Sequence, residues 1–169
     1  TMWGRGYPRA LSAHPSNPYT VYLGIDGDDG GGVFKSVDGG WHWARLKNQP
    51  GSLRMFYGLM VDPTDAKRIF WAACGEGGGV YRSEDAGESW KRVFDREEWV
   101  FNIHVDAQGT VYAPGKGLWA STDHGSTWKQ LTRQGSDLHI VGLETDPENP
   151  ARIWFSRVPW DASAGGGVY

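Results

Sequence analysis

Short runs in which apolar and polar residues alternate recur along the whole chain. The stretch 100–105, Val-Phe-Asn-Ile-His-Val, is one example, and it ends at Asp106. Alternation with period two predicts a half-buried β-strand, because successive side chains point to opposite faces of a sheet. Similar short runs follow at 110–113, 117–121 and 128–132. We therefore predict four short antiparallel strands in this region and no helix.

The same four-strand pattern occurs in the preceding part of the chain, which predicts a repeat. Its runs are 57–61, 68–73, 79–83 and 90–94. A pair of β-favouring residues, the second of them aromatic, also marks each unit: Val21-Tyr22, Ile69-Phe70, Val111-Tyr112 and Ile153-Trp154. Self-similarity at such a period is typical of repeat architectures, in which each unit is one small sheet.

A motif, Ser-x-Asp-x-Gly-x-x-Trp, follows the third predicted strand in three units. Its aspartates, Asp38, Asp85 and Asp123, are 47 and 38 residues apart. The remaining motif residues are Ser36, Gly40, Trp43, Ser83, Gly87, Trp90, Ser121, Gly125 and Trp128. We expect each carboxylate to accept backbone hydrogen bonds in a tight turn, each glycine to adopt positive φ, and each indole to cover the turn.

The repetition favours a structural role for these aspartates, because a catalytic carboxylate is needed once rather than in every unit. Position 42 is a histidine, where the other two copies have Ser89 and Thr127. We expect His42 to weaken one hydrogen bond of the first turn.

The predicted fold class is all-β, a β-propeller segment of four-stranded antiparallel blades. Three blades are complete and a fourth is truncated, over the approximate ranges 8–46, 55–94, 99–132 and 139–169. The whole chain, 1–169, is then one propeller segment. An open arc leaves apolar faces at both ends. We therefore expect further blades, from the rest of a longer chain or from another copy.

The repeated motif resembles the Asp-box, or bacterial neuraminidase repeat, of sialidases, sortilin-type receptors, xyloglucan hydrolases and photosystem assembly factors. The resemblance implies an Asp-box β-propeller that is secreted or periplasmic and binds or hydrolyses a polysaccharide. Sortilin-like and assembly-factor-like members imply an alternative, a non-catalytic scaffold for protein partners. These families share a fold rather than one chemistry, so the resemblance leaves the activity open.

Composition narrows the classes of partner. The net charge is −3, and no run of Lys or Arg is present, which argues against nucleic acid. The longest apolar run, 69–74, is far too short to span a membrane, so we expect no span. Cys74 is the only cysteine, so the chain forms no internal disulfide. We predict no cofactor and no metal.

Ligand-binding candidates lie on the rim opposite the repeated turns, because the loops there differ from unit to unit. They include Trp99, Arg157, Trp160 and Asp161. Indoles stack on sugar rings while charged groups bond hydroxyls, so this composition favours a polysaccharide. A protein ligand, or a solvated loop face whose tryptophans pack on the next blade, is the alternative.

Asp26 is the candidate catalytic residue. The segment Tyr22-x-x-x-Asp26 resembles the catalytic-base segment of xyloglucan hydrolases. If the protein is an enzyme, the resemblance implies a glycoside hydrolase. Inverting hydrolysis needs two carboxyl groups, so we expect no complete active site in this chain alone. A flexible acidic turn with Asp28 and Asp29, or a calcium site, is the alternative.

His104 and Glu144 form a second candidate pair. When the innermost strands are aligned on their terminal aspartates, both occupy one matched position, together with Ser12 and Met60. Two such side chains on neighbouring blades can act as an acid–base pair and contribute to substrate binding. They can equally fill a solvated central channel.

Overall fold

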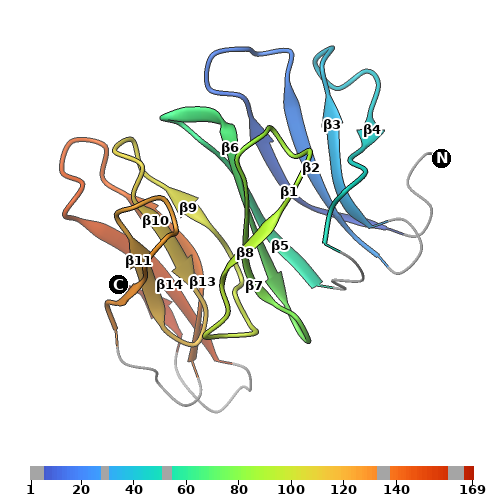
Figure 1. The fold of residues 1–169 in the computed structure, drawn as a ribbon. Helices are drawn as coiled ribbons and strands as arrows, with labels where there is room; N and C mark the ends of the chain where they lie inside the picture. The colour runs from blue at the N-terminus through green and yellow to red at the C-terminus, as the bar shows by residue number, and fades with distance from the viewer. Residues whose placement is uncertain (1–5, 28–30, 51–54, 133–137, 160–165) are drawn as a thin grey trace.

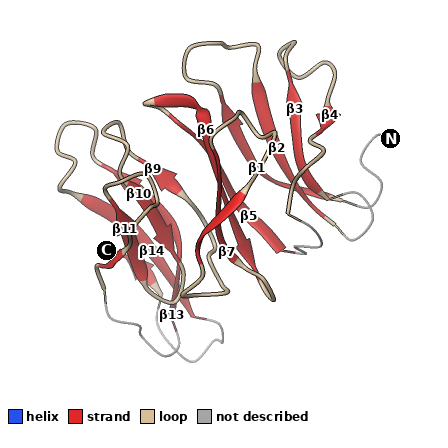
Figure 2. Ribbon diagram, in the orientation of Figure 1, coloured by secondary structure: helices blue, strands red, loops and turns tan. Residues whose placement is uncertain are grey.

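The regular elements in the described part of the chain are all β-strands. The structure, a computed structural model, describes residues 6–27, 31–50, 55–132, 138–159 and 166–169. These residues form four antiparallel sheets, three of four strands and one of three, and contain no helix. The sheets follow one another in an arc, the arrangement of a four-blade β-propeller (Figures 1 and 2).

Each sheet is a meander in which consecutive strands pair. Sheet A contains β1 (Tyr7–Ala13), β2 (Val21–Asp26), β3 (Gly32–Ser36) and β4 (Ala44–Arg45). Sheet B contains β5 (Met55–Asp62), β6 (Asp65–Cys74), β7 (Gly79–Ser83) and β8 (Lys91–Phe94). Sheet C contains β9 (His104–Val105), β10 (Val111–Pro114), β11 (Leu118–Ser121) and β12 (Lys129–Gln130). Sheet D contains β13 (Leu138–Thr145), β14 (Ile153–Pro159) and β15 (Gly167–Val168).

The expected propeller segment is therefore confirmed, with three complete sheets and an incomplete fourth. The first strand of sheet C differs from the expectation, because 100–105 predicted a strand and only His104–Val105 forms one. Asn102 explains the difference: its Oδ1 accepts the Ile103 amide at 2.8 Å, and its Nδ2 donates to the Val141 carbonyl at 3.3 Å. A side chain that caps its own backbone interrupts the strand ladder.

The apolar core lies between the sheets, which is what holds the arc together. Sheets A and B enclose a buried cluster of Tyr22, Val33, Leu46, Leu59, Val61, Ile69 and Trp71. Sheets B and C enclose Phe70, Ala72, Val80, Phe94, Val100, Ile103, Val105, Val111, Ala113 and Trp119. Sheets C and D enclose Tyr112, Leu118, Ala120, Ile140 and Leu143.

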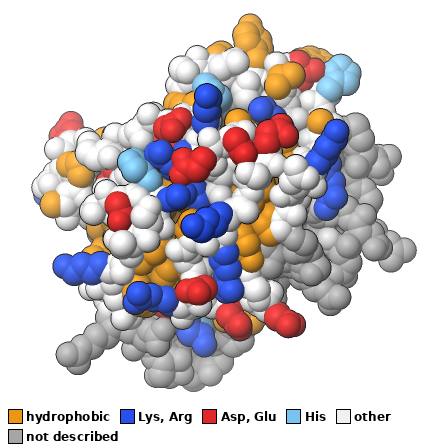
Figure 3. All heavy atoms as spheres, in the orientation of Figure 1, with side chains coloured by type: hydrophobic (Ala, Val, Ile, Leu, Met, Phe, Trp, Pro, Cys, Tyr) orange, Lys and Arg blue, Asp and Glu red, His pale blue; other side chains and the backbone are white. Residues whose placement is uncertain are grey.

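The surface is polar and carries both signs of charge. Figure 3 shows Lys and Arg side chains interspersed with Asp and Glu over the face in view. Some charges lie below this surface: the mostly buried Arg68 guanidinium contacts the buried Asp62 carboxylate at 3.0 Å and the exposed Glu84 carboxylate at 3.2 Å. No helix in the described ranges is long and apolar enough to cross a membrane.

Candidate functional site

The three repeated turns share one hydrogen-bond pattern. In sheet B the Ser83 hydroxyl donates to Asp85 Oδ1 at 2.7 Å and accepts the Gly87 amide at 2.8 Å. Asp85 Oδ1 also accepts the Ser89 amide at 2.8 Å. The Trp90 indole donates to the Gly87 carbonyl at 3.2 Å. Matching bonds occur at Asp38 and Asp123, and all three motif glycines have positive φ.

These bonds keep the turn aspartates ionised. A hydrogen bond from the Ser89 hydroxyl, followed by those from Ser83, lowers the pKa of Asp85 to about 2. The His42 amide is the main cause that lowers the pKa of Asp38 to about 2. Carboxylates whose lone pairs accept hydrogen bonds in this way stabilise the turn, so their role is structural, as the sequence repetition indicated.

The expectation that His42 weakens the first turn is wrong. His42 Nδ1 lies 2.6 Å from Asp38 Oδ2, and its amide donates to Asp38 Oδ1 at 2.9 Å. Ser89 and Thr127 make the equivalent pair of contacts in the other turns. An imidazole nitrogen therefore replaces the hydroxyl, because the exposed turn leaves room for the larger ring.

The opposite rim carries a row of aromatic rings. Trp99 and Phe101 lie in the connection between β8 and β9, and His139 lies near the start of β13 in sheet D. The Trp99 and Phe101 centroids are 6.3 Å apart, and those of Phe101 and His139 are 5.1 Å apart. All three side chains are half-buried, so each keeps an exposed edge or face. We call Trp99, Phe101 and His139 the aromatic row.

Backbone pairing fixes this row in place. Trp99 forms an isolated β-bridge with Cys74, and the Phe101 amide donates to the Pro114 carbonyl at 3.0 Å. Burial, together with the nearby charge of Lys116, lowers the pKa of His139. The His139 ring is thereby kept neutral near pH 7, which suits contact with an uncharged ligand.

Glu97, in the connection between β8 and β9, has a structural role at this rim. It is buried, its Oε1 accepts the Trp119 indole at 2.8 Å, and its Oε2 accepts the Lys116 amide at 3.0 Å. A buried carboxylate with both oxygens bonded positions the loop between β10 and β11. It thus supports the rim rather than facing a ligand.

Asp26 ends β2 on the same rim. Its Oδ2 lies 3.4 Å from Arg9 Nε, and its side chain is largely buried. The neighbouring residues 28–30, which include Asp28 and Asp29, lie outside the described ranges. The catalytic role of Asp26 stays a prediction, and its one described ion pair is with a guanidinium rather than with a second carboxyl group.

Of the remaining rim candidates, Arg157 lies within the described residues. Trp160 and Asp161 lie outside the described residues. Arg157 lies in β14 with its guanidinium 5.7 Å from the centroid of the Tyr169 ring. It also lines a small cavity of about 50 Å³ between sheets C and D, with Lys116, Thr132, Ile140 and Phe155.

His104 and Glu144 do come together. His104 Nδ1 lies 3.7 Å from Glu144 Oε2, and His104 Nε2 lies 3.0 Å from Thr145 Oγ1. Burial lowers the pKa of His104, although the charges of Glu144 and Asp106 partly oppose this. The acid–base role stays a prediction, while the adjacency that the strand alignment indicated is present.

Neither a reactive cysteine nor a metal site is found among the described residues. Burial raises the pKa of Cys74 to about 12, and the thiol donates to the Val100 carbonyl at 3.1 Å, so it is not a nucleophile at neutral pH. Within the described part of the chain, no group of three or more His, Cys, Asp or Glu side chains could hold a metal ion.

Sequence reasoning missed Phe101 and a charged cluster around Asp62. Phe101 falls inside an expected strand, so its alternation pattern concealed its place in the aromatic row. Asp62 is fully buried, and its Oδ2 contacts Arg68 at 3.0 Å and His124 Nδ1 at 3.3 Å. The recurrence of an aspartate near the end of the first strand in three of the four units, Asp62, Asp106 and Asp146, was the available signal for this position.

Solved structures with the same fold include glycoside hydrolases and a protein-binding propeller. The GH74 enzyme of Niastella koreensis has a TM-score of 0.73 and 19% identity, covering 88% of this chain and 25% of that one. The GH74 xyloglucanase of Xanthomonas campestris has a TM-score of 0.71 and 20% identity, covering 94% and 28%. YCF48 bound to D1 peptide has a TM-score of 0.58 and 15% identity, covering 97% and 54%.

The chain therefore spans about a quarter of the length of these glycoside hydrolase structures. No protein-family model matches the sequence, and neither does the sequence of any curated protein. At these identities the similarity establishes the β-propeller fold, whereas function must be argued from the site.

Proposed function

We propose that this chain is part of an Asp-box β-propeller that binds a polysaccharide on the rim opposite the repeated turns. The observation that carries the proposal is the aromatic row of Trp99, Phe101 and His139, which runs along that rim from sheet C to sheet D. The fold similarity to GH74 xyloglucanases supports the choice of a plant-type glucan as the first ligand to test. Such a ligand implies a location outside the cytoplasm.

The chemistry of the row suits sugars. Pyranose rings present apolar C–H faces that pack on aromatic rings, while their hydroxyl groups need polar partners at the edge of the contact. Lys116 and Arg157, which line the small cavity between sheets C and D, are available as hydrogen-bond donors beside the row. The Trp99 and Phe101 rings are inclined by 33° and the Phe101 and His139 rings by 68°, so the row offers adjacent aromatic groups in different orientations, along which an extended chain can lie.

The proposal covers binding rather than hydrolysis. Inverting hydrolysis requires an acid and a base separated by enough space for a water molecule. Asp26 supplies one carboxyl group at this rim and already contacts Arg9. Hydrolysis would need a second carboxyl group opposite Asp26, and the candidate rim residues described above do not supply it.

The test is calorimetric titration of a xyloglucan oligosaccharide into the wild-type chain and two variants. Trp99→Ala should weaken binding about tenfold, because one stacking ring is lost. Trp41→Ala is the matched control, since Trp41 is 85% exposed and lies on a turn at the other end of the sheets. Equal affinity of the Trp99→Ala variant and the wild type would remove the aromatic row from the site.

A protein ligand on the same rim is the second candidate. It is favoured by the fold similarity to YCF48 bound to D1 peptide. Retention of a protein partner on immobilised wild type and its loss on Trp99→Ala, with no glycan bound by either, would favour this candidate.

A further inference from the structure

Two positively charged side chains lie beside the aromatic row, and backbone contacts between sheets C and D bring them together. Lys116 directly follows Gly115, whose carbonyl accepts the Ile140 amide at 2.8 Å. Ile140 in turn pairs with Arg157 in the register of β13 and β14. Because Ile140 directly follows His139 in the sequence, both cations are placed next to the aromatic row.

The small cavity between sheets C and D is lined by both cations. Its volume is about 50 Å³, and its walls come from both sheets, so it lies inside an interface of the arc. A water molecule takes up about 30 Å³ in the liquid, so the cavity admits a group of a few heavy atoms and not a sugar ring. Besides Lys116 and Arg157, its lining comprises the Thr132 side chain and two apolar ones, Ile140 and Phe155. We call it the cationic cavity.

The positive charge of the cavity is not balanced by the described carboxylates. The ion pairs of the described residues include neither Lys116 nor Arg157. Glu97 is close, but its two oxygens accept the Trp119 indole and the Lys116 amide. The Lys116 charge lowers the pKa of His139 more than the Glu97 charge raises it, so the electrostatic potential beside the row is positive.

We propose that the polysaccharide bound on this rim is acidic, with sugar rings that lie on the aromatic row and a carboxylate that enters the cationic cavity between Lys116 and Arg157. This inference rests on the proposed function, because it names the chemical class of the ligand at the same site. The sugar ring itself is uncharged, which suits the neutral His139 ring, while the carboxylate of a uronic acid extends from the ring by one bond.

A carboxylate fits this cavity better than a hydroxyl group does. A guanidinium presents paired N–H donors that match the two oxygens of a carboxylate, and charge-assisted hydrogen bonds are roughly twice as strong as neutral ones. Arg157 is half-buried, so water screens its charge less than that of an exposed arginine. A second cation, Lys116, adds to the attraction for an anion and gives little preference for a neutral hydroxyl.

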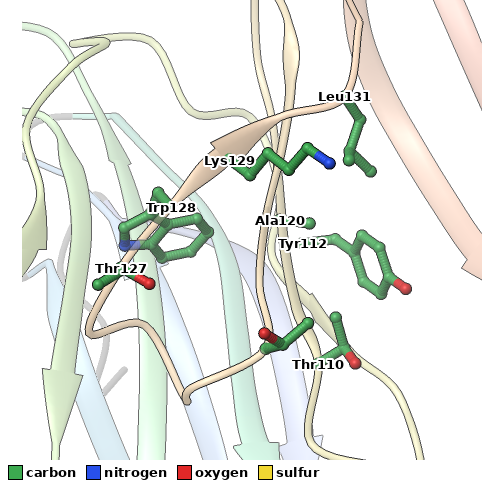
Figure 4. A pocket seen from close by; sticks show the side chains of 8 residues that line it. Thr110, Tyr112, Ala120, Thr127, Trp128, Lys129 and Leu131 are labelled. Carbon is green, nitrogen blue, oxygen red and sulfur yellow. The ribbon is translucent and has the colours of Figure 1, made fainter.

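A larger hollow on sheet C lacks this combination of charges. It has a volume of about 400 Å³, and Thr122, Thr127 and Trp128 of the repeated turn are part of its lining. Figure 4 shows Lys129 as the charged side chain among the residues that line it. Lys129 is exposed, as Lys116 is, so it provides a matched control at the other end of the same sheet.

The test compares two ligands with the same rings by calorimetric titration. They are cellotetraose and the tetraglucuronate formed when its primary alcohols are oxidised to carboxylates. The wild-type chain should bind the tetraglucuronate about tenfold more tightly, because a hydrogen bond to a charged group replaces one to a neutral group. Added NaCl should reduce this preference, since salt screens the charges.

Variants assign the preference to the cavity. Lys116→Gln and Arg157→Gln should each reduce the preference to about threefold or less, because each removes one of the two cations. Lys116 is exposed and its bond to Glu97 is made by the backbone amide, so Lys116→Gln keeps the fold. Lys129→Gln, which changes the net charge equally, should keep the full preference. Trp99→Ala should weaken both ligands alike and leave their ratio unchanged.

The outcomes separate this inference from the proposed function. Equal affinities of the wild type for the two ligands, with cellotetraose still weakened by Trp99→Ala, would overturn the acidic ligand and leave the aromatic row as the site. An unchanged preference in the Lys116→Gln and Arg157→Gln variants would place the carboxylate elsewhere. Binding of tetraglutamate as tight as that of the tetraglucuronate, and insensitive to Trp99→Ala, would replace the sugar with an acidic polypeptide. No binding of either saccharide would overturn both proposals.

Discussion

A single serine hydroxyl organises each of the three repeated turns. Ser83 is 1% exposed, and its Oγ donates to Asp85 and accepts two backbone amides, those of Asp85 and Gly87. A buried amide that loses its hydrogen-bond acceptor lowers the stability of the fold, because its desolvation is no longer compensated. The serine is therefore more important to stability than its small size indicates, and the aspartate, which is more exposed, acts partly through it.

Ser83→Ala should lower the free energy of unfolding by about 2 kcal/mol, because the Gly87 amide is left buried without its partner. Ser89→Ala in the same turn should cost less, since Ser89 is exposed and water can replace its bond to Asp85. Urea denaturation of the two variants compares them directly. A larger loss for the Ser89→Ala variant would contradict this account of the turn.

The matched position on the innermost strands contacts the next sheet in each unit. The Ser12 hydroxyl accepts the Val61 amide at 2.9 Å, and Met60 Sδ accepts the Val105 amide at 3.1 Å. His104 follows the same rule by contacting Thr145. The regularity supports the alternative that His104 fills the space between inner strands, whereas the Glu144 side chain is 81% exposed.

His104 should make stability depend on pH. Burial lowers its native pKa below the ordinary histidine value near 6.5, so below that pH the unfolded chain binds a proton that the native chain resists. Stability should therefore fall as the pH drops below about 6.5, and His139, whose pKa is also lowered, adds to the fall. His104→Gln should reduce the difference in unfolding free energy between pH 7 and pH 5.5, measured by denaturant titration. An unchanged difference would contradict the role of His104.

The sequence predicted the positions of site residues that belong to the repeat and not those of residues outside it. The alignment of inner strands placed His104 beside Glu144 because both lie at a fixed distance from a repeated aspartate. The burial of Glu97 could not be predicted in the same way, because it depends on an indole, Trp119, that approaches from another strand. Loop residues such as Asp26 have no periodic pattern, so their partners follow only from the folded chain.

At the scale of strands and turns, a polar cluster joins sheet B to sheet C. Asp62 ends β5, is fully buried, and accepts bonds from the Thr64 amide and hydroxyl and from Arg68. His124, in the turn of sheet C, contacts the same carboxylate at 3.3 Å. Burial alone would raise the pKa of Asp62, but the hydrogen bonds from Thr64 and Arg68 and the charge of Arg68 outweigh it and lower the pKa. A charge held this way fixes the position of the neighbouring turn.

Asp62→Ala should lower the free energy of unfolding by about 3 kcal/mol, because it leaves the mostly buried Arg68 without its closest carboxylate. Asp65→Ala is the matched control, since the Asp65 side chain is 42% exposed and lies 3.4 Å from the same guanidinium. Thermal unfolding followed by circular dichroism measures both. Equal losses would show that the cluster acts as a solvated surface network.

Most strands were predictable because the alternation of apolar and polar residues and the repeated turn motif indicate the same strand positions. The exception is the start of sheet C, where alternation over 100–105 indicated a strand that the Asn102 side chain interrupts. The local sequence pattern contains no information about the hydrogen bond from Asn102 to the Val141 carbonyl, because Val141 belongs to another sheet. Sequence patterns thus give an element its type, and contacts between sheets set its length.

At the scale of the whole molecule, the four sheets form a linear series in which each contacts its neighbours. Stability in such a series is approximately a sum of unit and interface contributions, so units at the ends are weaker than those in the middle. Sheets B and C have buried interfaces on both sides, whereas sheets A and D each have one. The last six residues of β6 are buried, while β1 is mostly exposed.

Native-state amide exchange should therefore be slowest in β6 and β10 and at least about tenfold faster in β1 and β14, because sheets at the ends of the arc open without disrupting the middle. Mass spectrometry of peptic fragments resolves these strands. Uniform exchange in all four sheets would show that the arc unfolds as one cooperative unit, in which no interface is weaker than another.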